Sequence, residues 1–177
     1  LLAQCDVSDD DSVGAAFDTV GKELGNLDCL VHAIAFAKRE DLDGRFTDTS
    51  RDGFHLALGV SAYSLNVLVQ GAESLLKEGS GVVALTYLGS ERAIPRYNVM
   101  GVAKAALESG VRYLAMDLGE KGIRVNGLSA GPIRTLAARG IRDFNAMLKV
   151  HADRAALKRN NDVDEIGDAA LFLCSRL

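Results

Sequence analysis

G-V-V-A-L-T-Y-L-G-S-E-R-A-I-P-R-Y-N-V-M-G-V-A-K, residues 81–104, is the stretch in which a buried strand gives way to a helix. The uncharged, β-branched run 81–86 is typical of a strand buried on both faces, so we expect Tyr87 at its carboxyl end. Open α/β sheets bind their ligands at that edge. The helix predicted over 95–120 keeps one apolar face and begins at Pro95, a residue that suits a first turn.

Tyr97 and Lys104 are seven positions apart in this predicted helix. At about 3.6 residues per turn, that spacing returns almost to the same side of the helix, roughly 10 Å further along its axis. An ammonium beside a phenol favours phenolate character and stabilises negative charge that develops on a substrate oxygen. The pair therefore suits a reaction that passes through an enolate or alkoxide, although the spacing also fits a packed aromatic ring and a solvated lysine.

Apolar and amphipathic segments alternate along the rest of the chain. We expect strands at 1–7, 27–34, 81–86 and 123–128. We expect helices from Ser8 or Asp9 to Gly25, from Ser50 to about Lys77, from 95 to Gly122, and after Asp162 or Asp164, with a loop over 38–49. Strictly alternating strands and helices predict a parallel sheet in a single α/β domain, a Rossmann-like doubly wound fold over residues 1–177.

The helix predicted from Ser50 contains three glycines that weaken it. Gly53, Gly59 and Gly71 each cost about 1 kcal/mol relative to alanine, and tight packing against a neighbour can explain one of them. The S-A-Y-S run at 61–64 also lies inside this helix, where hydroxyl groups are usually structural. We favour a structural role for these serines over a direct catalytic one.

Composition narrows the class of protein. With 177 residues, 48% of them hydrophobic, the chain can bury one substantial core. A net charge of −4 gives no support for nucleic-acid binding. No apolar run reaches the length of a membrane span and no signal-peptide pattern opens the chain, which predicts a cytoplasmic protein with no membrane partner.

The cysteines and histidines show no spacing typical of a metal site. Cys5, Cys29 and Cys174 are odd in number, far apart and set among apolar neighbours, which favours reduced structural thiols over a disulfide frame. We assign no chemistry to the three histidines, His32, His55 and His151. The sequence therefore predicts no bound metal.

Two features follow the last predicted strand. The Gly-Pro turn within 129–135 leads into a predicted helix, whose free N–H groups suit a phosphate or a carboxamide, or serve only as an ordinary cap. Between Arg134 and Arg159 basic residues greatly outnumber acidic ones. A basic patch on an acidic chain can recruit an acidic partner, although most charge runs are solvated faces.

The spacing Tyr97-x6-Lys104, with Tyr87 ten residues upstream, resembles the signature of the bacterial NADH-dependent enoyl-[acyl-carrier-protein] reductases. These are divergent short-chain dehydrogenase/reductases, whose more usual members space the pair as Tyr-x3-Lys, where this chain has Gly101. Further resemblance runs through the whole chain: C-D-V at 5–7, H-A-I-A-F-A at 32–37, S-A-Y-S at 61–64, R-V-N-G-L-S-A-G-P-I-R-T at 124–135 and I-R-D-F at 141–144.

The resemblance implies a reaction and its catalytic residues. NADH, with NADPH not excluded, would deliver hydride to the β-carbon of a trans-2-enoyl thioester in fatty-acid biosynthesis. Tyr97 and Lys104 would be the catalytic pair and Tyr87 a second active-site tyrosine. The Tyr97 hydroxyl would stabilise charge on the thioester oxygen, while Lys104 would hold the nicotinamide ribose.

The resemblance also implies binding residues and partners. Cofactor contacts would come from Asp6, Val7, Ile34, Lys104, Ile133, Arg134, Thr135, Leu136 and Ala137. The acyl substrate would meet Ala37, Tyr87, Tyr97, Phe144 and Met147, with 134–159 as a substrate-covering helical segment. Acyl carrier protein would deliver the substrate, and a homotetramer would form partly on the helices at 50–77 and 95–120.

Compared with this family, the sequence lacks the glycine-rich amino-terminal region and the final strand. The absent first strand would lie between the strands at 1–7 and 27–34, so we expect further residues before Leu1 and after Leu177. Two alternatives remain open at this point. The chain could reduce a ketone or oxidise an alcohol like other members of the superfamily, or it could be an inactive fragment that serves as a scaffold.

Overall fold

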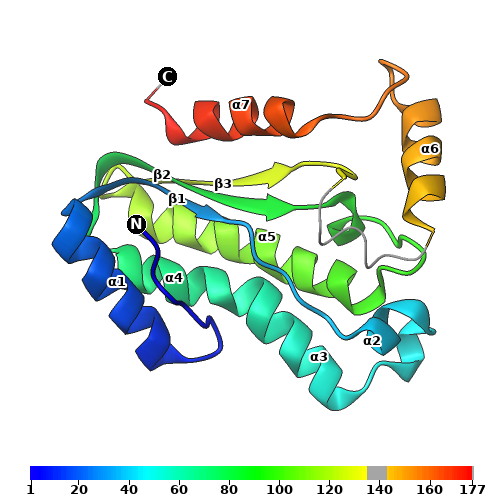
Figure 1. Ribbon diagram of the computed structural model, residues 1–177, viewed down its shortest axis with the longest axis horizontal. Coiled ribbons are helices and arrows are strands. Elements are labelled where there is room, and N and C mark those ends of the chain that lie inside the picture. The colour runs from blue at the N-terminus through cyan, green and yellow to red at the C-terminus, as the bar shows by residue number, and fades with distance from the viewer. Residues whose placement is uncertain (135–142, 177) are drawn as a thin grey trace.

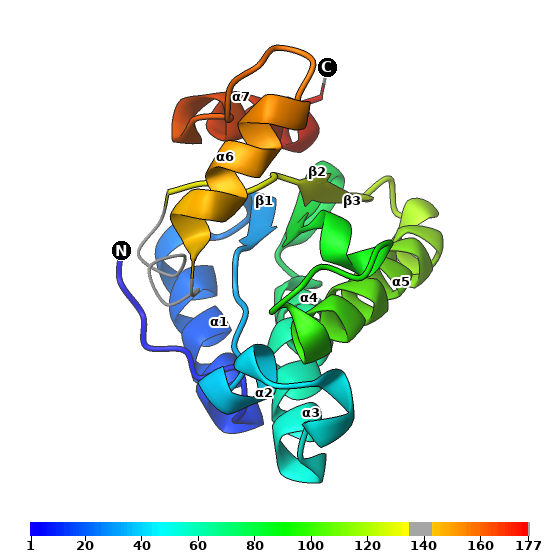
Figure 2. The same cartoon turned by 90° about the vertical axis from the view of Figure 1, so that its right-hand side faces the viewer.

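The protein is described by a computed structural model covering residues 1–134 and 143–176, in which a parallel sheet lies between helices (Figure 1). Its three strands are β1 (Leu27–His32), β2 (Leu76–Thr86) and β3 (Arg124–Ser129), paired in parallel in the order β1-β2-β3. On one face lie α4 (Ser64–Ala72) and α5 (Asn98–Gly119), and on the other lies α7 (Val163–Cys174) (Figures 1 and 2). The expected doubly wound α/β arrangement is confirmed.

Side-chain caps begin three of the helices where the sequence predicts them. Asp9 accepts a hydrogen bond from the N–H of Asp11 at the start of α1 (Asp10–Leu24), and Ser50 accepts one from Gly53 at the start of α3 (Arg51–Leu58). Asp162 caps α7 in a reciprocal pair with Glu165. Each cap satisfies a backbone N–H that has no partner within the helix.

The main core fills the space between the sheet and the α4–α5 layer. Val82 and Ala84 of β2 are fully buried, and they pack with Leu65 of α4 and Leu107 of α5. A smaller cluster joins Val13 of α1 to α4 and to the segments that flank β1. The β2 run is buried on both faces, as its continuous apolar sequence predicts.

The predicted strand at 1–7 is wrong. This segment has no regular structure, and β1 lies at one edge of the three-stranded sheet. An extended segment becomes a strand only when a neighbouring strand pairs with its backbone N–H and C=O groups. Apolar content alone therefore misled the prediction, because no described strand lies beside residues 1–7.

Two further boundaries differ from the predictions. The expected loop at 38–49 contains the short helix α2 (Arg39–Asp43) and the 3₁₀ turn η1 (Phe46–Asp48). The helix expected over 50–77 is divided into α3, a π-helical turn η2 (Gly59–Tyr63) and α4. It stops at Ala72 because Leu76 already pairs with Leu27 as the start of β2.

The helix expected over 95–120 begins three residues later than Pro95. Tyr97 occupies the cap position before α5, and its neighbours Arg96 and Asn98 have positive φ angles of 63° and 33°. Pro95 therefore lies in the turn that precedes the helix. At the other end, α5 stops at Gly119, and Gly122 with φ of 68° turns the chain into β3.

Tight packing explains two of the three glycines in the divided helix rather than one. A Cβ added at Gly53 would lie 1.9 Å from an oxygen of Asp41, and one at Gly71 would lie 2.5 Å from the ring of Phe17. A Cβ added at Gly59 meets no described heavy atom within 4 Å. Gly59 instead opens the π-helical turn.

The expectation of three reduced cysteines is also wrong. Cys29 of β1 and Cys174 of α7 form a disulfide with their Cα atoms 5.6 Å apart, while Cys5 is free and exposed. The two cysteines are 145 positions apart in sequence. Their proximity arises because α7 packs across the sheet, which no local sequence pattern reveals.

The remaining described elements are η3 (Leu88–Ser90) and α6 (Phe144–Arg154). The start of the helix predicted after the Gly-Pro turn falls at 135–142, outside the described residues. Within the described residues, no helix has both the length and the apolar character needed to cross a bilayer. Those residues also contain no cluster of three or more side chains suited to a metal ion.

Candidate active site

Two tyrosines meet at the carboxyl end of β2. Tyr87 follows the strand directly, and Tyr97 stands at the cap position of α5. Their ring centroids are 5.0 Å apart with an angle of 69° between the planes, which is an edge-to-face contact. Both side chains are half-buried. The structure thus brings together the two tyrosines that the sequence singles out.

Two glycines allow this contact to form. A Cβ at Gly89 of η3 would lie 2.4 Å from Cδ1 of Tyr97, and a Cβ at Gly101 of α5 would lie 2.7 Å from the carbonyl oxygen of Gly89. The turn after β2 therefore rests directly on the first turns of α5. This contact leaves no room for a side chain at Gly101, the position where the more usual spacing would put the lysine.

Lys104 is buried and tied to the same end of β2. Its side chain is 7% exposed, and Nζ donates a hydrogen bond of 2.7 Å to the carbonyl oxygen of Leu85. Burial lowers the pKa of Lys104 to about 8, while the charge of Glu108 acts in the opposite direction. Glu108 in turn accepts a hydrogen bond of 2.6 Å from the hydroxyl of Thr86.

The surroundings of Tyr97 disfavour its phenolate form. Burial, and then the neighbouring Tyr87, raise the pKa of Tyr97 above its usual value of 10. Burial also raises the pKa of Tyr87. Both phenols therefore remain protonated at neutral pH, and each can donate a hydrogen bond to an oxygen that gains negative charge.

The residues expected to bind the cofactor are partly brought together. Val7 and Ile34 pack on the same small cluster, formed by Val13, Val67 and Leu68. Asp6 is exposed, and its carboxylate accepts a hydrogen bond from the N–H of Ser8. Ile133 is half-buried and Arg134 exposed after β3. The expected contacts Thr135, Leu136 and Ala137 lie outside the described residues.

Helix α6, which lies in the segment expected to cover the substrate, reaches Tyr87. The Tyr87 hydroxyl lies 3.9 Å from the sulfur of Met147. An ion pair between Arg96 and Asp143 joins the turn before α5 to the residue before α6. Phe144 in the first turn of α6 is half-buried, as is Ala37 beyond β1. Of the expected acyl contacts, Met147 is therefore the one with a described contact to a tyrosine.

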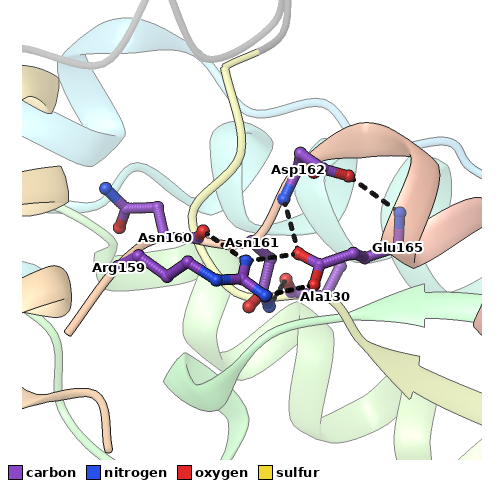
Figure 3. Close-up of polar contacts among 6 residues, drawn as sticks. All are labelled: Ala130, Arg159, Asn160, Asn161, Asp162 and Glu165. Carbon is purple, nitrogen blue, oxygen red and sulfur yellow. Dashed lines mark hydrogen bonds and ion pairs between the residues drawn. The ribbon is translucent and has the colours of Figure 1, made fainter. Parts of the chain in front are cut away.

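The loop after α6 is attached to the turn after β3. The Asn161 side chain donates a hydrogen bond of 3.2 Å to the carbonyl oxygen of Ala130 (Figure 3). Nearby, Arg159 forms an ion pair with Glu165 of α7. One cation of the predicted basic patch is thereby neutralised.

Sequence reasoning missed several residues that shape the site. Glu108 follows Lys104 by four positions, and this helical spacing could have identified it as a charge that raises the pKa of the lysine. Gly89 gave no comparable signal, since its role depends on the close approach of two segments. His32, to which we assigned no chemistry, is fully buried, with its Nε2 2.7 Å from the hydroxyl of Ser64.

Comparisons with known proteins agree on one family. A family model described as "Enoyl-(Acyl carrier protein) reductase" matches residues 1–177. The chain is 52% identical to the enoyl-[acyl-carrier-protein] reductase [NADH] of Bacillus cereus over 177 residues, which are 100% of this chain and 69% of that protein. It is 54% identical to a Staphylococcus aureus enoyl-[acyl-carrier-protein] reductase [NADPH] over 176 residues, which are 99% of this chain and 69% of that protein.

A solved structure agrees with these sequence matches. The crystal structure of the Bacillus cereus enoyl-acyl carrier protein reductase with NADP+ and indole naphthyridinone superimposes with a TM-score of 0.96 at 52% identity. The match covers 99% of this chain and 68% of that one. This chain belongs to the enoyl-[acyl-carrier-protein] reductase family.

Proposed function

We propose that this protein reduces the trans-2 double bond of enoyl thioesters carried on acyl carrier protein, with NADH as the reductant. The observation that carries the proposal is the edge-on contact of the Tyr97 ring with Tyr87 directly after β2, the strand end to which the buried Lys104 is also hydrogen-bonded. A protonated phenol suits an enolate oxygen, because it can donate a hydrogen bond as negative charge arrives there.

Each residue of the site has a defined task in this reaction. Reduced nicotinamide supplies the hydride to the β-carbon of the substrate. Tyr97 would donate its hydrogen bond to the thioester oxygen, and the enolate would then take a proton from solvent at its α-carbon. Tyr87 packs against Tyr97 and limits its movement, which keeps the donor aligned.

Lys104 fits a role in holding the cofactor ribose. An ammonium group carries three N–H donors. Within the described residues, Lys104 donates to one acceptor, the carbonyl oxygen of Leu85. Further donors can serve ribose hydroxyls. Its buried charge also adds a positive field to the site where negative charge develops.

The remainder of the cofactor site is proposed along the carboxyl ends of the strands. Val7 and Ile34 provide apolar contacts, with Asp6 and Val7 at the adenine and Ile34 along the cofactor. Ile133, Arg134 and residues 135–137 would contact the nicotinamide and pyrophosphate. The relatives named above are labelled for both NADH and NADPH, so the preference of this chain is a matter for measurement.

We propose that residues 134–159 cover the acyl chain as part of the same single domain. Support comes from the contact of Met147 with the Tyr87 hydroxyl and from the ion pair of Asp143 with Arg96. Phe144 and Met147 would line one side of the acyl pocket and Ala37 another. Acyl carrier protein, an acidic partner, would dock beside exposed basic residues such as Arg134, Lys149 and Arg154.

We further propose a homotetramer, built partly on the outer surfaces of η2 and α5. Tyr63 is 56% exposed, and on α5 Tyr113 is 69% and Met116 79% exposed. Large apolar side chains exposed together on neighbouring elements favour an interface with another copy. Light scattering on wild-type protein and on Tyr113→Glu with Met116→Glu tests this proposal, since the double variant should dissociate.

A cytoplasmic location is also proposed, because the free and exposed Cys5 fits a reducing compartment. The Cys29–Cys174 disulfide is the opposing observation, since disulfides are rare in such a compartment. Quantifying free thiols in protein extracted under acid quench tests this location. A free thiol count of one would argue against it.

The reaction is tested by following reduced-nicotinamide consumption with a crotonyl thioester and, in parallel, a 3-ketoacyl thioester, each with NADH and with NADPH. Turnover of the enoyl substrate supports the proposal. Turnover of the ketone alone would assign the chain to ketone reduction. Inactivity with both substrates would favour a scaffold.

A further inference from the structure

Two buried serines hold the chain that leaves β1. Ser64 of α4 donates a hydrogen bond of 2.6 Å to the Val60 carbonyl oxygen, so the nearby His32 imidazole donates to Ser64 from Nε2. Three residues earlier, Ser61 accepts a hydrogen bond of 2.9 Å from the Phe36 N–H and donates one of 3.0 Å to the Phe36 carbonyl oxygen. Both serines are 0% exposed.

Ser61 contacts a residue outside the sheet, whereas Ser64 contacts a residue within it. His32 belongs to β1 and its backbone is paired with β2, whereas Phe36 lies in irregular chain beyond the strand. Ser61 therefore takes the place of a strand partner, because one hydroxyl engages both backbone groups of Phe36. The position of residues 33–37 depends on this side chain more than on the sheet.

The helix is distorted where Ser61 lies. Ser61 is the central residue of η2 (Gly59–Tyr63), a π-helical turn between two α-helical segments. Such turns cost hydrogen-bond geometry and are frequent at functional sites. At this distortion two serines contact β1 and the chain that follows it. Ser61 is hydrogen-bonded to Phe36, and Ser64 to His32.

We propose that Ser61 is a positioning residue for catalysis. By fixing the Phe36 backbone it holds Ile34 and Ala37, the proposed cofactor and acyl contacts on either side, at the distance that binding requires. This inference rests on the proposed function, because the roles of Ile34 and Ala37 do. The hydroxyl must accept one hydrogen bond and donate another, a requirement that serine and threonine meet and alanine or valine do not.

Ser61→Ala and its control Ser64→Ala test the proposal. In Ser61→Ala we expect the KM for NADH and for crotonyl thioester to rise roughly tenfold, with a smaller change in kcat. The reason is that Ile34 and Ala37, the proposed contacts of these two substrates, are no longer held in position. Ser64→Ala removes the hydroxyl of an equally buried serine in the adjoining helix α4, with its hydrogen bonds to Val60 and His32. We expect it to lower the Tm and to leave both KM values near those of the wild type.

A second pair keeps the test decisive if Ser61→Ala fails to fold. Ser61→Thr and Ser61→Val have side chains of the same shape, and the hydroxyl is their one difference. We expect the threonine variant to retain KM values well below those of the valine variant. Equal KM values in this pair, or equal rises in Ser61→Ala and Ser64→Ala, would overturn the proposal.

Failure of the proposed function can be told apart from failure of this inference. If wild-type protein does not reduce the enoyl thioester, NADH affinity measured by fluorescence still compares the threonine and valine variants. Weaker NADH binding by Ser61→Val would support the positioning role without the reaction. Equal binding would contradict it.

Discussion

The ring of Tyr97 lies edge-on against the ring of Tyr87, with centroids 5.0 Å apart, and the backbone of Gly89 closes directly over the Tyr97 ring. Gly89 itself rests on Gly101 of α5. The position of the proposed hydrogen-bond donor is thus set by a contact between two backbone segments. Side chains added at this contact should displace the phenol.

Gly101→Ala should therefore remove most activity, because the new Cβ would lie 2.7 Å from the Gly89 carbonyl oxygen. Gly110→Ala is a matched control in the same helix, where an added Cβ meets no described heavy atom within 4 Å. The control should keep full activity and gain about 1 kcal/mol of stability. Steady-state kinetics and urea unfolding of both variants check this, and similar activities would contradict it.

The charge of Lys104 should make cofactor binding depend on pH. Because burial lowers its pKa to about 8, the amine loses its proton as the pH rises through that value, and kcat/KM for NADH should fall. Glu108→Gln should move this fall to lower pH, since the Glu108 charge raises the lysine pKa. Lys104→Arg, whose guanidinium stays charged, should show no such fall. A flat wild-type profile from pH 7 to 9.5 would contradict this role.

His32 should make the fold sensitive to acid. Burial first, and then the charge of Lys104, lower the pKa of His32 from its usual 6.5 to about 4. Between these values the unfolded chain binds more protons, so stability is present above pH 6.5 and is lost as the pH falls toward 4, by on the order of 3 kcal/mol.

Urea unfolding of the wild type and of His32→Gln at pH 7 and pH 4 measures this loss. Glutamine keeps a donor for Ser64 but does not titrate, so the variant should lose less stability on acidification than the wild type. Equal losses in the two proteins would assign the acid sensitivity to other groups.

Gly59→Ala should stabilise the protein by about 1 kcal/mol, because the site has helical angles of φ −57° and ψ −53° and an added Cβ meets no described heavy atom within 4 Å. Gly53→Ala in the adjoining helix should destabilise it, since the Cβ would lie 1.9 Å from an oxygen of the buried Asp41. Thermal unfolding of both variants decides the question. A lower Tm for Gly59→Ala would show that the π-helical turn needs glycine.

Local sequence predicted those features that depend on local chemistry. The caps at Asp9, Ser50 and Asp162 were predicted because their hydrogen bonds reach only two or three residues along the chain. The buried run of β2, and the place of Tyr87 directly after it, follow from its apolar sequence. The alternation of helices with the three strands β1, β2 and β3 was likewise predicted, although the strand expected at 1–7 was not found.

Features that depend on distant partners were not predicted. Residues 1–7 resemble a strand but have no described neighbour to pair with, and Cys29 meets Cys174 only through the packing of α7. The pKa of Tyr97 rises because of burial first and of the neighbouring Tyr87 second, and burial is a property of the folded chain. The contact of Ser61 with Phe36 was not predicted because the two residues are 25 positions apart in sequence.

The most direct test of the account is the turnover of crotonyl thioester by Tyr97→Phe, measured together with its affinity for NADH. The variant keeps the ring that packs on Tyr87 and loses the hydroxyl alone. We expect kcat to fall by about 10²–10³, the usual cost of removing one donor to a developing oxyanion, with NADH affinity unchanged. Turnover at the wild-type rate would show that Tyr97 does not stabilise the enolate and would contradict the proposed mechanism.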